Sequence, residues 1–226
     1  MESPVVEQVG GGAAVESGPG RATGWALLLG GICGLVVAVA HPRGHPVEMA
    51  AGTDAWTTIH VFGAVGFGLL ATAALIELAA RQPGSERSTA ETIGLAGATV
   101  FGVMAMITMT IDGFTNPALA SLRGTPGAEH LKAALLGMES GLAAIGYGGF
   151  GLAAALAVTA RLLRLRGAAA RAVAGVASLA LVAFALGAIL YIGMGIQALA
   201  LLMAPTPLAM AWFILVGVRS VRGSAA

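Results

Sequence analysis

Histidine and carboxylate side chains lie at the edges of apolar stretches of the chain, where they could form a polar site. The candidates are His41, His45, His60, Asp112 and Glu139. Imidazole nitrogens and carboxylate oxygens bind divalent metal ions, and histidine also exchanges protons near neutral pH. We predict His41, His45, His60 and Asp112 as metal ligands. We predict His41, His60, Asp112 and Glu139 as the residues that would hold a cofactor or small ligand.

Each candidate also has a purely structural interpretation. Residues 41–46 read His-Pro-Arg-Gly-His-Pro, and the two prolines favour a rigid loop over a helix that would place both histidines on one face. His60 could form a hydrogen bond between helices. Asp112 could cap a helix or pair with Arg123. Residue type alone leaves these alternatives open.

The composition is that of a membrane protein. Of the 226 residues, 57% are hydrophobic and only 10% are charged, whereas a soluble domain carries about 25% charged residues. Too few polar side chains remain to cover a water-exposed surface, so lipid is the expected solvent. A net charge of +1 and the lack of a long basic run exclude an electrostatic nucleic-acid binder.

Six apolar segments follow a polar N-terminal stretch. They are Trp25–Ala40, Trp56–Ala80, Ile93–Ile111, Met138–Ala160, Ala170–Tyr191 and Ile196–Val218. Segments of about 20 residues cross the hydrocarbon core as helices, because lipid offers no partner to an exposed backbone. We therefore predict an all-α integral membrane bundle of six transmembrane helices. The last two segments should be joined by a tight outer turn at Gly193–Gly195, and no span should be broken at mid-depth.

The organisation along the chain is simple. Residues 1–22 are predicted to be a disordered tail, 23–220 the transmembrane domain and 221–226 a short C-terminal tail. One alternative concerns the first segment, because Ala38-Val39-Ala40 resembles a signal-peptide cleavage site before His41. Cleavage would leave five spans, although the acidic residues upstream argue against a signal peptide.

The distribution of Lys and Arg predicts the orientation. Most of them lie in the N-terminal tail, the second and fourth loops and the C-terminus: Arg21, Arg81, Arg87, Arg161, Arg164, Arg166, Arg171, Arg219 and Arg222. The remaining loops hold only Arg43, Arg123 and Lys132. Positively charged loops stay in the cytoplasm, so we predict a multi-pass protein of the plasma (inner) membrane with both termini cytoplasmic. The histidines then face outward, and Glu77 lies at the inner end, one turn before Arg81 as a pairing partner.

Small residues at four-residue spacing predict close helix packing. The third segment carries Gly94, Ala98 and Gly102, and the fourth carries Gly137 and Gly141. Such ridges let the backbones of membrane helices approach each other. We expect both to lie in helix contacts.

Three short motifs resemble those of a known group of proteins. They are His41-Pro42 after the first segment, Trp56 and His60 at the start of the second, and Asp112-Gly113-Phe114 with Pro117 after the third. Over residues 25–220 the chain resembles multi-span membrane proteins of actinobacteria and other high-GC bacteria, in the style of the DUF4386-type families. A second His-Pro at positions 45–46 and the long polar tail depart from that pattern. The resemblance implies the architecture and an outer-face site, and it carries no activity.

Three functional hypotheses follow. The first is an accessory, non-catalytic membrane protein whose outer-face His/Asp/Glu site binds a metal or small ligand, or docks a larger membrane complex or a second copy. The second is a small proton-coupled transporter, which requires a polar path across the bilayer. The third is a membrane oxidoreductase subunit with an outer-face haem or quinone. Paired histidines deep in two spans, as a buried bis-histidine haem requires, are missing from the sequence.

Overall fold

All regular structure in the described part of the chain is helical, as expected where the backbone has no water to bind. The computed structural model describes residues 20–41, 55–80, 87–122 and 124–223. The elements are α1 (Arg21–Ala40), α3 (Ala55–Ala79), α4 (Thr89–Ser121), α5 (Ala128–Leu162), α6 (Ala168–Gly187), the π-helix η1 (Ala188–Gly193), the 3-10 helix η2 (Gln197–Met203) and α7 (Thr206–Gly223). With η1 continuing α6 and η2 preceding α7, six helical segments are long and apolar enough to cross a membrane. The prediction of an all-α bundle with six spans is confirmed.

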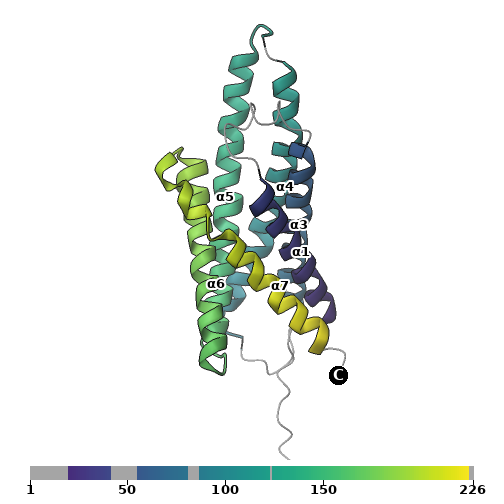
Figure 1. Cartoon of the computed structure of the whole chain (residues 1–226), viewed down its shortest axis with the longest axis vertical. Coiled ribbons are helices and arrows are strands. Elements are labelled where there is room, and N and C mark those ends of the chain that lie inside the picture. Colours follow the sequence, from purple (N-terminus) through teal and green to yellow (C-terminus); the bar gives the residue numbers. More distant parts are fainter. Residues whose placement is uncertain (1–19, 42–54, 81–86, 123, 224–226) are drawn as a thin grey trace, which may run out of the picture.

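The helices pack in chain order around the bundle, and the last one returns to the first. α1 packs on α3, α3 on α4, α4 on α5 and α5 on α6, while α7 packs mainly on α1 and touches α6 less (Figure 1). The start of α1 and the end of α7 lie at the same end, and α4 and α5 project beyond the other helices at the opposite end (Figure 1). The first segment, for which the signal-peptide alternative remained, is thus a packed member of the bundle.

Several helix boundaries differ from the predicted ones. α1 begins at Arg21, inside the predicted tail, and α7 continues to Gly223. The rest of the tail lies outside the described residues. α4 runs on to Ser121 with Pro117 inside it, so the prediction that Asp112 ends the third span is wrong. A segment predicted from hydropathy ends at the first charged residue, whereas a helix continues as long as its backbone groups are hydrogen-bonded.

The sixth span is interrupted between η2 and α7, a break that hydropathy did not predict. Between η2 and α7 the chain passes through Pro205, and α7 then runs obliquely across the bundle (Figure 1). Proline has no N–H to donate and clashes with a preceding helical turn, so the segment cannot continue as one α-helix. The tight turn at Gly193–Gly195 is confirmed, with Gly195 at a φ of +70°. No charged residue lies between Arg171 and Arg219.

Glycine brings α4 and α5 into backbone contact. A Cβ added at Gly94 would lie 2.6 Å from the backbone nitrogen of Ala157, and one at Gly102 would lie 2.9 Å from the Ala71 side chain on α3. The ridge on the third segment is therefore confirmed as a packing surface. The ridge at Gly137 and Gly141 is not, since an added Cβ there meets nothing within 4 Å.

This contrast supplies a matched test of the packing. Gly94→Ala is expected to lower the free energy of unfolding by about 1–3 kcal/mol, because the new methyl group meets rigid backbone atoms of α5. Gly137→Ala makes the same chemical change in open space and should be neutral or stabilise by up to about 1 kcal/mol. Unfolding of the detergent-purified variants by SDS titration measures both. Equal stabilities would contradict the close α4–α5 contact.

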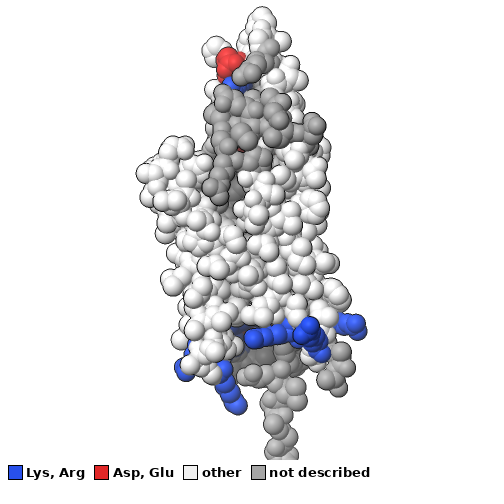
Figure 2. Space-filling model, viewed as in Figure 1, with Lys and Arg blue, Asp and Glu red and all other residues white. Residues whose placement is uncertain are grey.

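An ion-pair network joins three helices at the end of the bundle where α1 begins and α7 ends. Glu91 on α4 accepts from Arg161 Nε at 2.7 Å and also bonds to Arg164, and Arg161 bonds in turn to Glu77 on α3. Arg87 donates to the backbone oxygen of Glu77 at 2.6 Å. Glu77 is therefore paired across helices; its predicted partner Arg81 lies outside the described residues. Figure 2 shows most of the Lys and Arg side chains gathered at this end of the bundle below a belt of uncharged residues, with a small blue patch beside a red one at the opposite end.

Candidate functional site

Three of the predicted metal ligands meet near the other end of the bundle. His41 directly follows α1, His60 lies one turn into α3 and Asp112 lies in α4. His60 Nε2 is 3.2 Å from His41 Nε2 and 2.9 Å from Asp112 Oδ2. One ligand atom from each residue lies within 4.8 Å of the others. Residues that are far apart in the sequence thus converge because α1, α3 and α4 are neighbours in the bundle.

His60 is fully buried and held in a defined orientation. Its Nδ1 lies 2.7 Å from the backbone oxygen of Trp56, one turn earlier, and its ring stacks on the Trp56 indole with centroids 4.4 Å apart. A carbonyl can only accept, so Nδ1 must carry the proton in this contact. Nε2, which faces His41 and Asp112, is therefore the nitrogen with the available lone pair in the neutral ring. This is the arrangement by which proteins orient metal-binding histidines.

Proline in α4 explains one of the two hydrogen bonds by which α3 holds the α4 backbone beside the site. Pro117 has no N–H, so the carbonyl of Gly113, four residues earlier, loses its helical partner. The hydroxyl of Thr57 donates to that carbonyl at 2.8 Å, and Trp56 Nε1 donates to the Asp112 carbonyl at 3.1 Å. In lipid a freed carbonyl needs such a protein partner. The start of α3 is thereby fixed against the part of α4 that carries the candidate carboxylate.

A second carboxylate lies behind the first and is linked to it by an amide. Asn116, fully buried one turn after Asp112, donates through Nδ2 to Asp112 Oδ1 and lies 3.3 and 3.4 Å from the two carboxylate oxygens of Glu139 on α5. Asn116 Oδ1 is buried and has no hydrogen-bond partner among the described residues. Glu139 is thus part of the polar cluster, but it reaches the histidines only through Asn116 and Asp112.

The geometry suits a small divalent ion. A tetrahedral zinc ion bound at about 2.0–2.1 Å places its nitrogen ligands roughly 3.3 Å apart, close to the 3.2 Å between the two imidazole nitrogens. Asp112 supplies a carboxylate oxygen on the same side, and its other oxygen is held by Asn116. Two imidazoles and one carboxylate leave one coordination position for water or a ligand.

The structure brings some predicted residues together and leaves others apart. His41, His60 and Asp112 form the triad, and Glu139 stands behind it. The prediction for His45 lies outside the described residues, as does the alternative pairing of Asp112 with Arg123. Among the described residues, Asp112 contacts His60.

Sequence reasoning missed Asn116 as a site residue. The signal for it is the four-residue spacing from Asp112, which puts both side chains on one helix face. That signal can be read only if α4 continues past Asp112. Hydropathy ends the predicted segment at Ile111, and Pro117 argues against a helix at that point.

No family model, curated protein or solved structure matches this chain. The resemblance to DUF4386-type proteins therefore stays a prediction. The structure itself identifies the chain as an all-α membrane protein whose six apolar helices place a possible His/Asp metal-binding group at one end of the bundle.

Proposed function

We propose that this is an accessory, non-catalytic protein of the plasma membrane that binds a divalent transition-metal ion, Zn²⁺ as the working case, at the end facing away from the cytoplasm. The observation that carries the proposal is the 3.2 Å and 2.9 Å spacing of His41, His60 and Asp112 around one buried imidazole nitrogen. Two histidines and a carboxylate are a preferred ligand set for zinc and related ions.

The orientation belongs to the same proposal. The arginines of the described chain gather at the end where α1 begins and α7 ends (Figure 2). Positively charged segments are retained in the cytoplasm. This distribution supports cytoplasmic termini and an outward-facing metal site.

The proton-coupled transporter is less well supported, because the middle of the bundle is filled with aromatic side chains. Phe67 packs on Tyr147 and Phe150 with ring centroids 5.4 and 5.2 Å apart, and Phe150 lies 6.4 Å from Phe213. A transport path needs polar groups or a broken helix lining a cavity at mid-depth. The two polar clusters instead lie on opposite sides of this aromatic layer.

A haem held between His41 and His60 is also less well supported than a single ion. Axial nitrogens on opposite faces of a haem iron are roughly 4 Å apart with the macrocycle between them. His41 Nε2 and His60 Nε2 are 3.2 Å apart in direct contact, and their rings meet edge to face. The two histidines can bind one small ion with less movement of α1 and α3 than they would need to accommodate a porphyrin between them.

Zinc binding by the detergent-purified full chain tests the proposal. The wild type is expected to retain one Zn²⁺ per chain after equilibrium dialysis, measured by elemental analysis. His41→Ala, at a half-buried position, should weaken binding by at least about tenfold. His130→Ala removes an exposed histidine of α5 and should leave binding unchanged. Wild-type stoichiometry near zero, or equal affinity in the two variants, would overturn the proposal; size-exclusion chromatography confirms that both variants are folded.

A further inference from the structure

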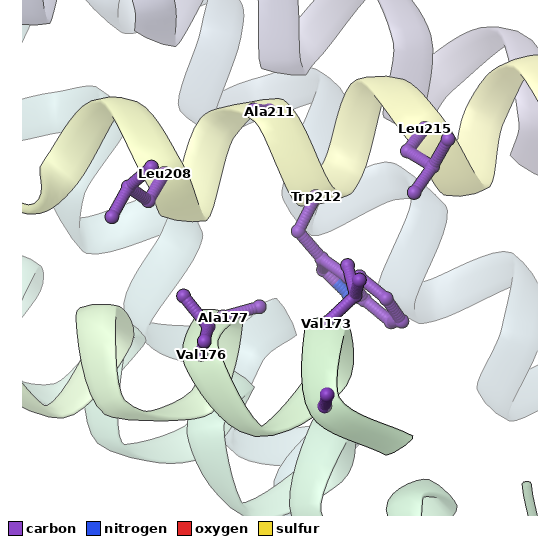
Figure 3. A pocket seen from close by; sticks show the side chains of 8 residues that line it. Val173, Val176, Ala177, Leu208, Ala211, Trp212 and Leu215 are labelled. Atoms are coloured by element: carbon purple, nitrogen blue, oxygen red, sulfur yellow. The ribbon is translucent and has the colours of Figure 1, made fainter. Parts of the chain in front are cut away.

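An apolar cleft lies between α6 and α7 on the outer surface of the bundle. It has a volume of about 320 Å³ and is lined by Ala172, Val173, Val176, Ala177, Leu208, Ala211, Trp212 and Leu215. Figure 3 shows the Trp212 ring extending from α7 toward Val173 on α6, with Leu208 and Leu215 on either side along α7. Both helices belong to spans, so this cleft opens toward lipid.

The cleft exists because α7 packs mainly on α1 and leaves a gap toward α6. α7 begins only after the break at Pro205 and crosses the bundle obliquely, resting mainly on α1 (Figure 1). A Cβ added at Gly217 would lie 2.6 Å from the backbone nitrogen of Leu28, which shows how close the α1–α7 contact is. The α6 side of α7 is correspondingly open.

The apolar stripe on α7 continues into arginine. Leu208, Trp212 and Leu215 are followed at helical spacing by Arg219 and Arg222, so all five positions share one helix face. Both arginines are exposed, and neither forms an ion pair with any residue that the structure describes. The stripe therefore ends in two cationic side chains near the C-terminal end of α7, at the end of the bundle where basic side chains gather (Figure 2).

We propose that this face binds one anionic phospholipid of the cytoplasmic leaflet, with an acyl chain in the α6–α7 cleft and its phosphate at Arg219 and Arg222. The cleft volume lies at the lower end of the range of about 300–1,000 Å³ for ligand pockets. Guanidinium groups bind phosphate through paired N–H donors, and basic residues between helices on the cytoplasmic side recognise anionic head groups. The charge at the end of the cleft selects an anionic lipid over a zwitterionic one.

Arg171 is the matched control. It is an exposed arginine in the first turn of α6, at the same end of the bundle. Helical geometry places it about half a turn away from the lining positions Ala172–Ala177. It carries the same charge but does not continue the cleft.

Binding of phosphatidylglycerol and phosphatidylcholine to the purified full chain tests the proposal, with lipid retention measured by native mass spectrometry. Phosphatidylglycerol should be retained preferentially. Arg219→Gln should weaken its retention by about fivefold, and adding Arg222→Gln should weaken it further. Arg171→Gln should change retention little. Ala211→Phe, which fills the cleft while keeping both arginines, should also reduce it.

Two results would overturn the proposal. Equal retention of both lipids would show that no site selects the anionic head group. Equal losses of phosphatidylglycerol retention in Arg171→Gln and Arg219→Gln would show that the lipid is held only by non-specific charge attraction. Zinc binding by the same variants should be unchanged, so this test is separate from that of the metal site.

Discussion

Replacing Glu91 by glutamine is expected to lower the free energy of unfolding by about 3 kcal/mol. Removing one partner of a buried ion pair costs about 3–5 kcal/mol, because the charge left behind has no compensation. The Glu91 side chain is only 4% exposed and bonds to both Arg161 and Arg164. Arg161 keeps Glu77, and Arg164 is nearly half exposed, so the lower end of the range applies.

A surface ion pair provides the control for this prediction. Glu129 lies 3.8 Å from Lys132, but its side chain is 77% exposed, and such pairs contribute about 0–1 kcal/mol. Glu129→Gln makes the same change of charge and should leave SDS unfolding nearly unaltered. If Glu91→Gln and Glu129→Gln unfold alike, the network does not hold α3, α4 and α5 together in the way described.

The second large effect is expected at Asp112. Asp112→Asn keeps the size and shape of the side chain but removes the charged ligand oxygen that faces His60. We expect zinc affinity to fall by more than about 100-fold, beyond the 10–100-fold that outer-shell changes typically cause. Glu139→Gln makes the same carboxyl-to-amide change at a residue that reaches the histidines only through Asn116 and Asp112, and it should weaken binding by less than about tenfold. Isothermal titration with Zn²⁺ measures both.

This pair of variants distinguishes a metal-ligating carboxyl group from a neighbouring one that does not bind the ion. General damage to the polar cluster would weaken binding similarly in Asp112→Asn and Glu139→Gln, because both variants replace a carboxyl group of that cluster by an amide. Similar losses would therefore be evidence against the His41–His60–Asp112 triad as the ligand set. Thermal unfolding of both variants without metal shows whether either change acts through the fold.

The sequence predicted the number of spans because lipid imposes one simple requirement on each segment. Apolar length and internally bonded backbone define a span locally, so hydropathy locates the six helices, although it misses the last ten residues of α4 and the first ten of α5. The clustering of His41, His60 and Asp112 at one end also followed from topology alone. Their contact did not, since the order of helices around the bundle depends on which surfaces pack together.

Two features of the cluster depended on long-range structure. Asn116 joins it only because α4 continues through Pro117, and that continuation relies on Thr57 of another helix bonding the freed carbonyl of Gly113. Similarly, Arg161 pairs with Glu77 across α3 and α5, whereas residues read along one helix suggest a partner one turn away. Neither arrangement can be predicted from the sequence of a single helix.

The uncharged turn between η1 and η2 has a consequence for how the chain enters the membrane. No charged residue lies between Arg171 and Arg219, and the turn at Gly193–Gly195 joins two segments that each span the apolar belt. Moving a charged loop across the hydrocarbon is costly, but moving this one requires only a few backbone groups to cross. The last two spans can therefore insert together as a single helical hairpin during synthesis. In the proposed orientation, the arginines at either end of the hairpin remain in the cytoplasm.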